Sequence, residues 1–413
     1  MKKLVLTMAS LVVLASMAFA QETPMLPESH GLLINQPAWG SSQVFDLATG
    51  WNWWSTYIST ADLQSLETAL GENGQRIMAS SGAVENGTDG WVGNLSSLDI
   101  SNMYAIQMAS ATTVTLRGSR ASVTEVPINL TNGWNWIGYP VNYDATVEYA
   151  LSNYTPQNGD LIKGTNGASE YDAQSGSWIG NLPGLQPGIG YMLKASTSSS
   201  FTYPAVPASG RGLLTPQYDN VTEWQPVMAS HPYNMNMIAV VTLNNEELRS
   251  DNIEIGVFNG ETCRGAVRPI YVDVLDQYLV FLTMYGENNE PYSFRMLDKE
   301  TGNVYESNEA SISFKADAVI GGVRAPFALN FNSKNSFAGA LNLFPNPVNR
   351  GEMVNLTLPA EGTVEVINVL GSTMKRVRMA EGSQLAADMA PGIYTIKVTD
   401  AEGNVFVDKL IIK

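Results

Sequence analysis

Gly50-Trp51-Asn52-Trp53-Trp54 and Gly133-Trp134-Asn135-Trp136-Ile137 are two versions of one aromatic stretch, and they decide how the chain is divided. The residues that follow them also repeat in step. Other matching pairs are Trp91-Val92-Gly93-Asn94-Leu95 with Trp178-Ile179-Gly180-Asn181-Leu182, and Tyr104 with Tyr191. Self-similarity of this kind is typical of one structural unit made twice. The sequence therefore predicts two tandem, tryptophan-rich modules, at 45–126 and 127–207.

Each module should be a compact α+β unit with one short helix. Apolar residues recur at helical spacing over 61–70, where Ser59 or Thr60 would be the N-cap and Gly71 the stop. A matching helix is predicted over 145–154, capped by Asp144. Short strands should follow each helix, at 76–79, 91–92, 103–108 and 114–117 in the first module and at 161–163, 177–179, 190–194 and 200–203 in the second.

Composition favours a mainly β, multidomain protein. The 413 residues include 36 glycines, and only 15% are charged, which is typical of short strands joined by many turns. The net charge of −16 would repel a phosphate backbone, so nucleic acid is excluded as a partner. The single cysteine, Cys263, cannot form an internal disulfide and should be a small buried residue at a strand entry.

The N-terminal residues form a predicted secretory signal peptide over 1–20. Lys2-Lys3 precede a short apolar run, and Ala18-Phe19-Ala20 is a small-x-small cleavage pattern. No later stretch approaches the roughly 20 apolar residues of a membrane-spanning helix. Residues 21–44 read as an extended lead-in.

Residues 208–333 predict a β-sandwich, because apolar or alternating runs are separated by Gly, Asn and Asp at close intervals. The runs cover 237–243, 253–258, 264–272, 278–285, 292–298 and 312–314. Asp298-Lys299-Glu300-Thr301-Gly302-Asn303 could supply oxygen ligands to calcium, but a hairpin turn is the favoured interpretation. Residues 334–340 are a predicted linker.

The last unit, 341–413, predicts a small antiparallel, Ig-like β-sandwich. It resembles the C-terminal sorting domain of proteins exported by the type IX (Por) secretion system of Bacteroidetes. The matching motifs are Phe344-Pro345-Asn346-Pro347, the strand and turn over 364–371, Pro391-Gly392-Ile393-Tyr394 and Lys409-Leu410-Ile411-Ile412-Lys413. The expected sorting-signal residues are Pro345, Asn346, Pro347, Gly392, Tyr394, Lys409 and Lys413.

The resemblance implies a route and a set of partners. The chain would cross to the periplasm, be recognised by the outer-membrane translocon through 341–413, and lose that segment to a sortase-like protease. It would then be released or fixed to surface lipopolysaccharide. The tryptophan-rich modules also resemble those of adhesin-like surface proteins.

Catalysis finds little support in the sequence. Only His30 and His231 could serve as the histidine of a Ser/His/Asp triad, no Gly-x-Ser-x-Gly elbow occurs, and zinc spacings are missing. Paired carboxylates could hydrolyse glycosides, but in so acidic a chain their presence is not informative. We therefore predict no enzyme, no catalytic residues, no metal and no cofactor. The favoured function is a non-enzymatic, adhesin-like binding protein at the cell surface or outside the cell, with a glycan or a host protein as ligand. The alternatives are a structural spacer and a hydrolase with an unrecognised site.

Tryptophans are the best lead to a ligand, since aromatic rings stack on sugars or peptide side chains and repetition gives avidity. Most of them should instead form the module cores. Trp91 and Trp178 are expected to be the exposed ones, because glycine and polar residues flank them. The candidate ligand-binding residues are Trp91, Trp178, Tyr104 and Tyr191.

Overall fold

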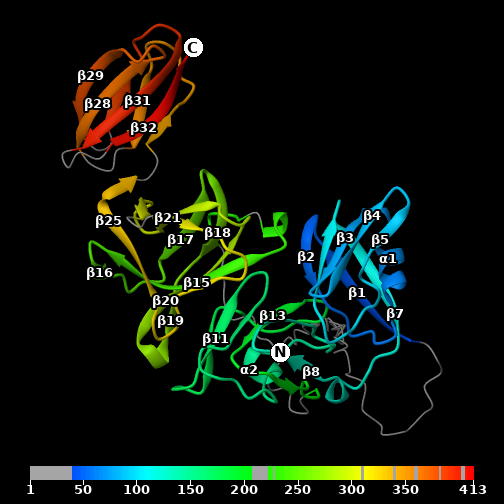
Figure 1. Cartoon of the computed structure of the whole chain (residues 1–413). Coiled ribbons are helices and arrows are strands. Elements are labelled where there is room, and N and C mark those ends of the chain that lie inside the picture. Colours follow the sequence, from blue (N-terminus) through cyan, green and yellow to red (C-terminus); the bar gives the residue numbers. More distant parts are fainter. Residues whose placement is uncertain are drawn as a thin grey trace, which may run out of the picture. The chain divides into compact units, whose positions relative to one another are not determined.

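The structure is a computed structural model that describes residues 40–206, 222–226, 228–307, 311–337, 341–357, 361–380, 383–400 and 405–413 (Figure 1). The predicted signal peptide and the lead-in up to residue 39 lie outside the described residues. Within the described ranges strands dominate, and the α-helices are α1 (Leu63–Leu70) and α2 (Val147–Ala150). The prediction of a mainly β, multidomain chain is confirmed.

The first tryptophan-rich segment forms a five-stranded antiparallel sheet with the order β2-β6-β3-β4-β5. A separate pair, β1 with β7, completes it. The bounds are β1 Ser41–Leu47, β2 Gly50–Trp54, β3 Gly74–Ala79, β4 Gly82–Gly87, β5 Gly90–Gly93, β6 Tyr104–Met108 and β7 Thr112–Gly118. Because β1 begins at Ser41 and pairs with β7, this unit takes in the end of the predicted lead-in.

The second segment has the corresponding order, β9-β13-β10-β11-β12, and the corresponding pair, β8 with β14. The bounds are β8 Ile128–Leu130, β9 Gly133–Ile137, β10 Leu161–Lys163, β11 Ala168–Asp172, β12 Ser177–Gly180, β13 Tyr191–Ala195 and β14 Ser199–Phe201. We call the two segments module 1 and module 2. That they are two copies of one unit remains our proposal, now supported by a shared strand order.

The shared Gly-Trp-Asn-Trp stretch has a local structural reason. Gly50 and Gly133 have φ values of 90° and 99°, a region that favours glycine. Asn52 stabilises the turn that begins at Ala48. Its Oδ1 accepts a hydrogen bond from the Ala48 amide at 2.8 Å, and its Nδ2 donates to the Ala48 carbonyl at 2.9 Å. Asn135 makes the same pair of bonds to Thr131.

Both helices are shorter than predicted. The N-cap of α1 is Asp62, whose carboxylate accepts from the Ser65 amide, and not Ser59 or Thr60. The N-cap of α2 is Thr146 and not Asp144. In each case a capping side chain nearer the apolar run satisfies the first-turn amides, so the helix starts later.

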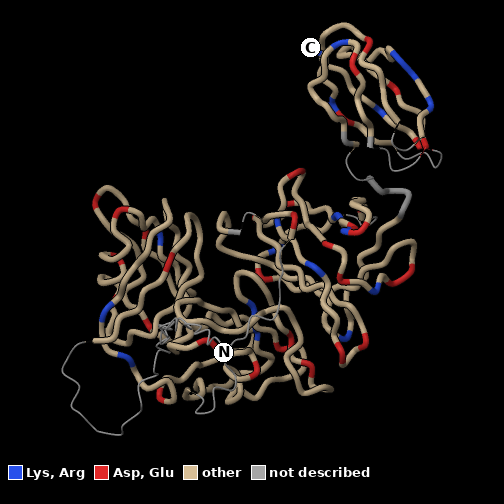
Figure 2. The backbone as a smooth tube through the Cα atoms, turned by 180° about the vertical axis from the view of Figure 1, so that it is seen from behind, with Lys and Arg blue, Asp and Glu red and all other residues tan. Residues whose placement is uncertain are grey.

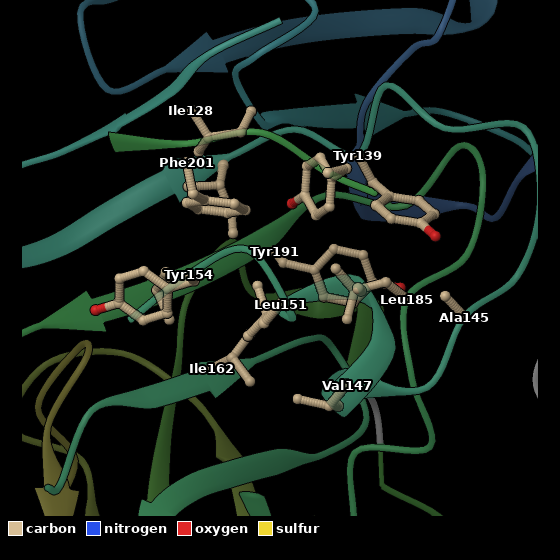
Figure 3. Close-up of a cluster of buried hydrophobic side chains, with 14 of the residues drawn as sticks. Ile128, Tyr139, Ala145, Val147, Leu151, Tyr154, Ile162, Leu185, Tyr191 and Phe201 are labelled. Atoms are coloured by element: carbon tan, nitrogen blue, oxygen red, sulfur yellow. The ribbon is translucent and has the colours of Figure 1, made fainter. Parts of the chain in front are cut away.

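Modules 1 and 2 meet through reciprocal contacts. Trp54 bridges to Ile189, and Ile137, which corresponds to Trp54 in module 2, bridges to Asn102 of module 1. Each module has its own apolar core. Figure 3 shows that of module 2, where Tyr139 and Tyr191 lie close to Leu151 and Leu185.

Residues 234–337 form one large sheet with the main order β18-β17-β21-β22-β25-β15-β20-β19. The bounds are β15 Asn234–Leu243, β16 Glu246–Glu247, β17 Ile253–Asn259, β18 Thr262–Val267, β19 Ile270–Val272, β20 Gln277–Tyr285, β21 Pro291–Asp298, β22 Val304–Ser307, β23 Ile312–Ser313, β24 Val319–Ile320 and β25 Phe327–Phe337. A Cβ added to Gly265 in β18 would lie 2.2 Å from the Thr283 carbonyl oxygen in β20. The sheet therefore curls until its two ends touch, around one apolar core. We call this part the central sandwich.

Two details of the central sandwich bear on the sequence predictions. The 298–303 segment is the turn of the β21–β22 hairpin, where the Gly302 amide donates to the Asp298 carbonyl at 2.8 Å. Strand β25 runs to Phe337 and pairs with β22, so the predicted linker over 334–340 begins inside a strand.

The C-terminal part is an antiparallel sandwich, as predicted. A three-stranded sheet, β26-β27-β30, and a four-stranded sheet, β29-β28-β31-β32, enclose a core made only of residues from 341–412. The bounds are β26 Asn342–Phe344, β27 Met353–Thr357, β28 Gly362–Asn368, β29 Thr373–Met379, β30 Gln384–Ala386, β31 Gly392–Asp400 and β32 Val405–Ile412. We call it the tail domain.

Acidic and basic residues are interspersed along the described backbone (Figure 2). A search of the described residues for a helix long and apolar enough to span a membrane finds none.

Candidate functional site

The tryptophans of the repeated stretch join the modules to the central sandwich. Trp53 Nε1 of module 1 donates to the Pro232 carbonyl at 2.9 Å, and Trp134 Nε1 of module 2 donates to the Asp317 carbonyl at 2.9 Å. Trp53 is also part of a small apolar cluster that contains Met192 of module 2. These rings therefore lie between parts of the protein rather than in the centre of one module.

A buried lysine lies at the same junction. Lys163 of β10 is fully buried and its Nζ donates to Asp317 Oδ1 at 2.8 Å and to the Asn234 carbonyl at 3.1 Å. The Nζ also lies 4.5 Å from the centre of the Trp134 ring, a cation–π distance. Burial lowers the pKa of Lys163, and the Asp317 carboxylate opposes that shift.

A second polar contact fixes β11 of module 2 to the central sandwich. Arg324 Nη2 donates to Asp172 Oδ2 at 2.6 Å, and the Val323 amide donates to Glu170 Oε1 at 3.1 Å. The hydrogen bonds from Arg324 hold the pKa of Asp172 well below its usual range. Module 2 and the central sandwich are thus held together at several independent points.

Module 2 covers the outer face of β15 and β20, and this face is apolar at one end and polar at the other. At one end Ile238 and Phe281 form an apolar cluster with Leu161 and Ile179 of module 2. At the other end the same face carries polar residues, because β15 pairs Asn234 with Tyr285 and Asn236 with Thr283. The polar end is where the contact opens into clefts.

The first cleft lies among module 1, module 2 and the central sandwich, and its volume is about 430 Å³. Pockets of roughly 300–1,000 Å³ with aromatic walls and a few polar groups are typical ligand sites. Six of its described lining residues carry the chemistry discussed below: Asp46, Trp51, Asn52, His231, Tyr233 and Asn234. We call it the aromatic cleft.

One polar atom of the aromatic cleft lacks a partner. Asn234 is 1% exposed, its Nδ2 donates to the Gly164 carbonyl, and its Oδ1 is buried with no hydrogen-bond partner among the residues that the structure describes. A buried acceptor without a partner costs roughly 1–3 kcal/mol. Asn234 thus lines the cleft with an acceptor that no described residue satisfies.

The four side chains that the sequence suggested as ligand contacts are placed differently. Tyr104 and Tyr191 are 1% and 2% exposed, and each hydroxyl accepts from a backbone amide of its own module. Their rings belong to the module cores and leave no free face for a ligand. Trp91 and Trp178 are half-buried against the cores of their modules, so only one side of each ring can face outward.

The aromatic cleft was missed by the sequence interpretation. Its walls come from β1, β2, the 187–189 loop, residues 229–234 and Tyr285, and no motif links these segments. One signal was present: Trp51 occupies the position that corresponds to Trp134. For His231 the sequence suggests only a catalytic base or a zinc ligand, and it supports neither.

Two other expectations concern cysteine and metals. Cys263 lies in β18 but is half-buried rather than buried. Burial raises the pKa of its thiol. Within the described ranges, no group of three or more His, Cys, Asp and Glu side chains is placed to hold a metal ion.

His231 should make the stability of the protein depend on pH. Its Nε2 lies 2.6 Å from Arg264 Nη1, and the other terminal nitrogen of Arg264, Nη2, pairs with Glu290. Burial lowers the pKa of His231, the Arg264 charge lowers it further, and Glu290 and Glu287 oppose the shift. The unfolded chain therefore binds a proton more readily than the folded chain, and stability should fall as the pH drops below about 6.5.

The measurement is a melting temperature at about pH 8 and about pH 5. His231→Gln keeps an acceptor for Arg264 but does not titrate, so it should lose less melting temperature than the parent on acidification. Equal losses in both proteins would exclude His231 as the source.

The residues predicted as the sorting signal tie the start of the tail domain to its last strand. Asn346 Nδ2 donates to the Lys409 carbonyl at 2.6 Å, and the Ile411 amide donates to Asn346 Oδ1 at 3.0 Å. The Lys413 amide donates to the Val348 carbonyl at 2.8 Å. Pro345 and Pro347 flank Asn346, Gly392 begins β31, and the Tyr394 hydroxyl donates to the Ala390 carbonyl. The motifs thus have a clear role in the fold.

Comparison with known proteins identifies the tail domain. Residues 342–413 match the family described as secretion system C-terminal sorting domain. No curated protein matches the chain.

Three solved structures show local similarity. The Bacteroides ovatus mixed-linkage glucan utilization locus protein SGBP-B, in complex with a mixed-linkage heptasaccharide, is 10% identical with a TM-score of 0.16, over 83% of this chain and 60% of that one. The Bacillus anthracis TIE protein is 10% identical with a TM-score of 0.15, over 82% and 58%. The BSP domain of a biofilm associated protein is 11% identical with a TM-score of 0.16, over 92% and 68%. The chain spans about three fifths of the length of the first two.

Proposed function

We propose that this type IX cargo protein, whose sorting tail directs it to the cell surface or the extracellular space, binds a neutral glycan in the aromatic cleft without cleaving it. The carrying observation is the combination in one cleft of the Trp51 and Tyr233 rings with the unpartnered Asn234 Oδ1. A sugar offers an apolar ring face to an aromatic side chain and hydroxyl donors to a carbonyl oxygen.

The polar groups of the cleft favour a sugar over a peptide. One common way for a peptide to bind is to pair with an exposed strand edge, whereas near the cleft β15 is bonded to β20 on one side and to β24 on the other. The described lining holds one carboxylate, Asp46, and no lysine or arginine. A ligand that brings hydroxyl groups rather than charges suits this lining.

The two alternative functions predict different chemistry. A glycosidase commonly uses two carboxyl groups that flank the scissile bond, and Asp46 is the single acid among the described lining residues. A structural spacer would need no cleft with an unpartnered polar atom. Both alternatives remain as outcomes of the binding experiment.

The test is a glycan array probed with the exported protein, followed by calorimetry on the glycan that binds best. Trp51→Ala should weaken that affinity by about tenfold, equivalent to about 1.4 kcal/mol, and should lower the stability less than a change at a fully buried tryptophan, because Trp51 is half-buried. Trp54→Ala, at a fully buried position outside the cleft, should instead destabilise by roughly 3–5 kcal/mol.

Trp91 and Trp178 provide the competing arm of the same experiment. If Trp91→Ala and Trp178→Ala weaken binding and Trp51→Ala does not, the ligand lies on the outer module surfaces that the sequence suggested. A blank array together with capture of a host protein would replace the glycan with a protein ligand. Retention of no ligand at all would leave the spacer role.

The partners of export follow the sorting tail. We propose that the translocon and a sortase-like protease act on 341–413, and that the mature protein is then released or joined to lipopolysaccharide. Mass spectrometry of the secreted form tests this, because the mature C-terminus should lie before residue 341.

A further inference from the structure

A second cleft adjoins the aromatic cleft and shares Tyr285 with it. It has a volume of about 310 Å³. Tyr285 lines both clefts, Thr165 lines the first, and the next residue, Asn166, lines the second. The Tyr285 hydroxyl donates to the Thr165 carbonyl, so the two clefts lie on either side of this contact. We call the second one the amide cleft.

The amide cleft is polar but uncharged. Its described polar lining includes Asn166, Asn181, Gln225 and Thr283, and none of its described lining residues is Asp, Glu, Lys, Arg or His. Side-chain amides and hydroxyl groups are therefore available for hydrogen bonds, with no charge to neutralise. This favours a neutral ligand rich in hydroxyl groups.

Nearby residues of strand β15 connect the two clefts. Asn234 and Asn236 are two residues apart on β15 and so lie on the same face of the sheet, about 7 Å apart. Asn234 lines the aromatic cleft, and Asn236 donates through Nδ2 to Thr283 Oγ1, which lines the amide cleft. Within the described part of the chain, the Oδ1 of each asparagine is buried and has no hydrogen-bond partner.

Resting on the proposed glycan-binding function, we propose that the two clefts are consecutive subsites for one extended, neutral oligosaccharide chain. The aromatic cleft stacks one part of the chain on Trp51, and the amide cleft hydrogen-bonds the next part through Asn166 and Gln225. Affinity then grows with the length of the oligosaccharide.

The experiment uses the full exported chain and two ladders of neutral probes, cello-oligosaccharides and manno-oligosaccharides, each from disaccharide to hexasaccharide. In the parent, affinity for one ladder should rise with length beyond the disaccharide. Asn166→Ala and Gln225→Ala should each weaken hexasaccharide binding by about fivefold to tenfold and leave disaccharide binding unchanged. Asn129→Ala, an exposed asparagine in β8 outside both clefts, is the matched control.

Affinity that is independent of length would overturn the inference while leaving a single glycan site intact. Equal weakening of disaccharide and hexasaccharide by the amide-cleft variants would also overturn it. A failure of both ladders to bind overturns it as well. The proposed function itself then falls only if the glycan array is blank too.

Discussion

Asp317→Ala should lower the free energy of unfolding by roughly 3–5 kcal/mol, because it leaves the Lys163 ammonium buried without its carboxylate. Lys163→Met should cost less, since it removes the buried charge and keeps an apolar chain against Trp134. The double variant Asp317→Ala/Lys163→Met should therefore be more stable than Asp317→Ala alone. Denaturant unfolding of all four proteins measures the three differences.

The pH dependence of the free energy of unfolding distinguishes the effect of charge from that of packing in these four proteins. Raising the pH toward about 10 allows a buried lysine to lose its proton, so the cost of Asp317→Ala should shrink there. A cost that is the same at all pH values would contradict the electrostatic explanation. If Lys163→Met costs as much as Asp317→Ala, packing around the side chain matters more than its charge.

Local patterns in the sequence predict many of the strands. Strand β10 was predicted at its observed bounds, and β15, β17, β20 and β21 within a few residues, because apolar runs between turn residues mark buried strands. Strands β4 and β11 were missed. Neither strand shows a clear alternation of apolar and polar residues. Strand β4, Gly82–Gly87, contains three glycines or alanines. Strand β11 contains polar Ser169 and Glu170 and pairs with the edge strand β12.

The candidate site could not be predicted in the same way. Alternation along β2 and β9 predicts that Trp53 and Trp134 lie on one face of their own sheets. It does not predict that this face packs against another part of the chain. Lys163, a lone charge in the apolar run Leu161–Lys163, was the available clue to an interface. The cleft itself combines segments spread from Val44 to Tyr285 in the sequence, so only the folded chain brings them together.

A chain that stops at residue 340 should fold yet fail to leave the cell envelope. The core of the tail domain contains only residues from 341–412, so its removal leaves the module and sandwich cores complete. Their melting transition should persist in the truncated protein. Since the sorting tail directs export to the cell surface or extracellular space, the truncated protein should be retained in the periplasmic fraction, as detected by immunoblot of periplasm, outer membrane and medium.

A single substitution in the full-length chain sharpens this prediction. Asn346→Ala removes two hydrogen bonds between the start of the tail domain and β32, at about 0.5–1.5 kcal/mol each, and should reduce export by loosening the last strand. Thr373→Ala, exposed in β29, is the matched control and should be exported like the parent. Export of the truncated chain at the parent level would show that a segment other than the tail domain carries the export signal. A protein that binds glycan outside the cell would then have to be exported by another pathway.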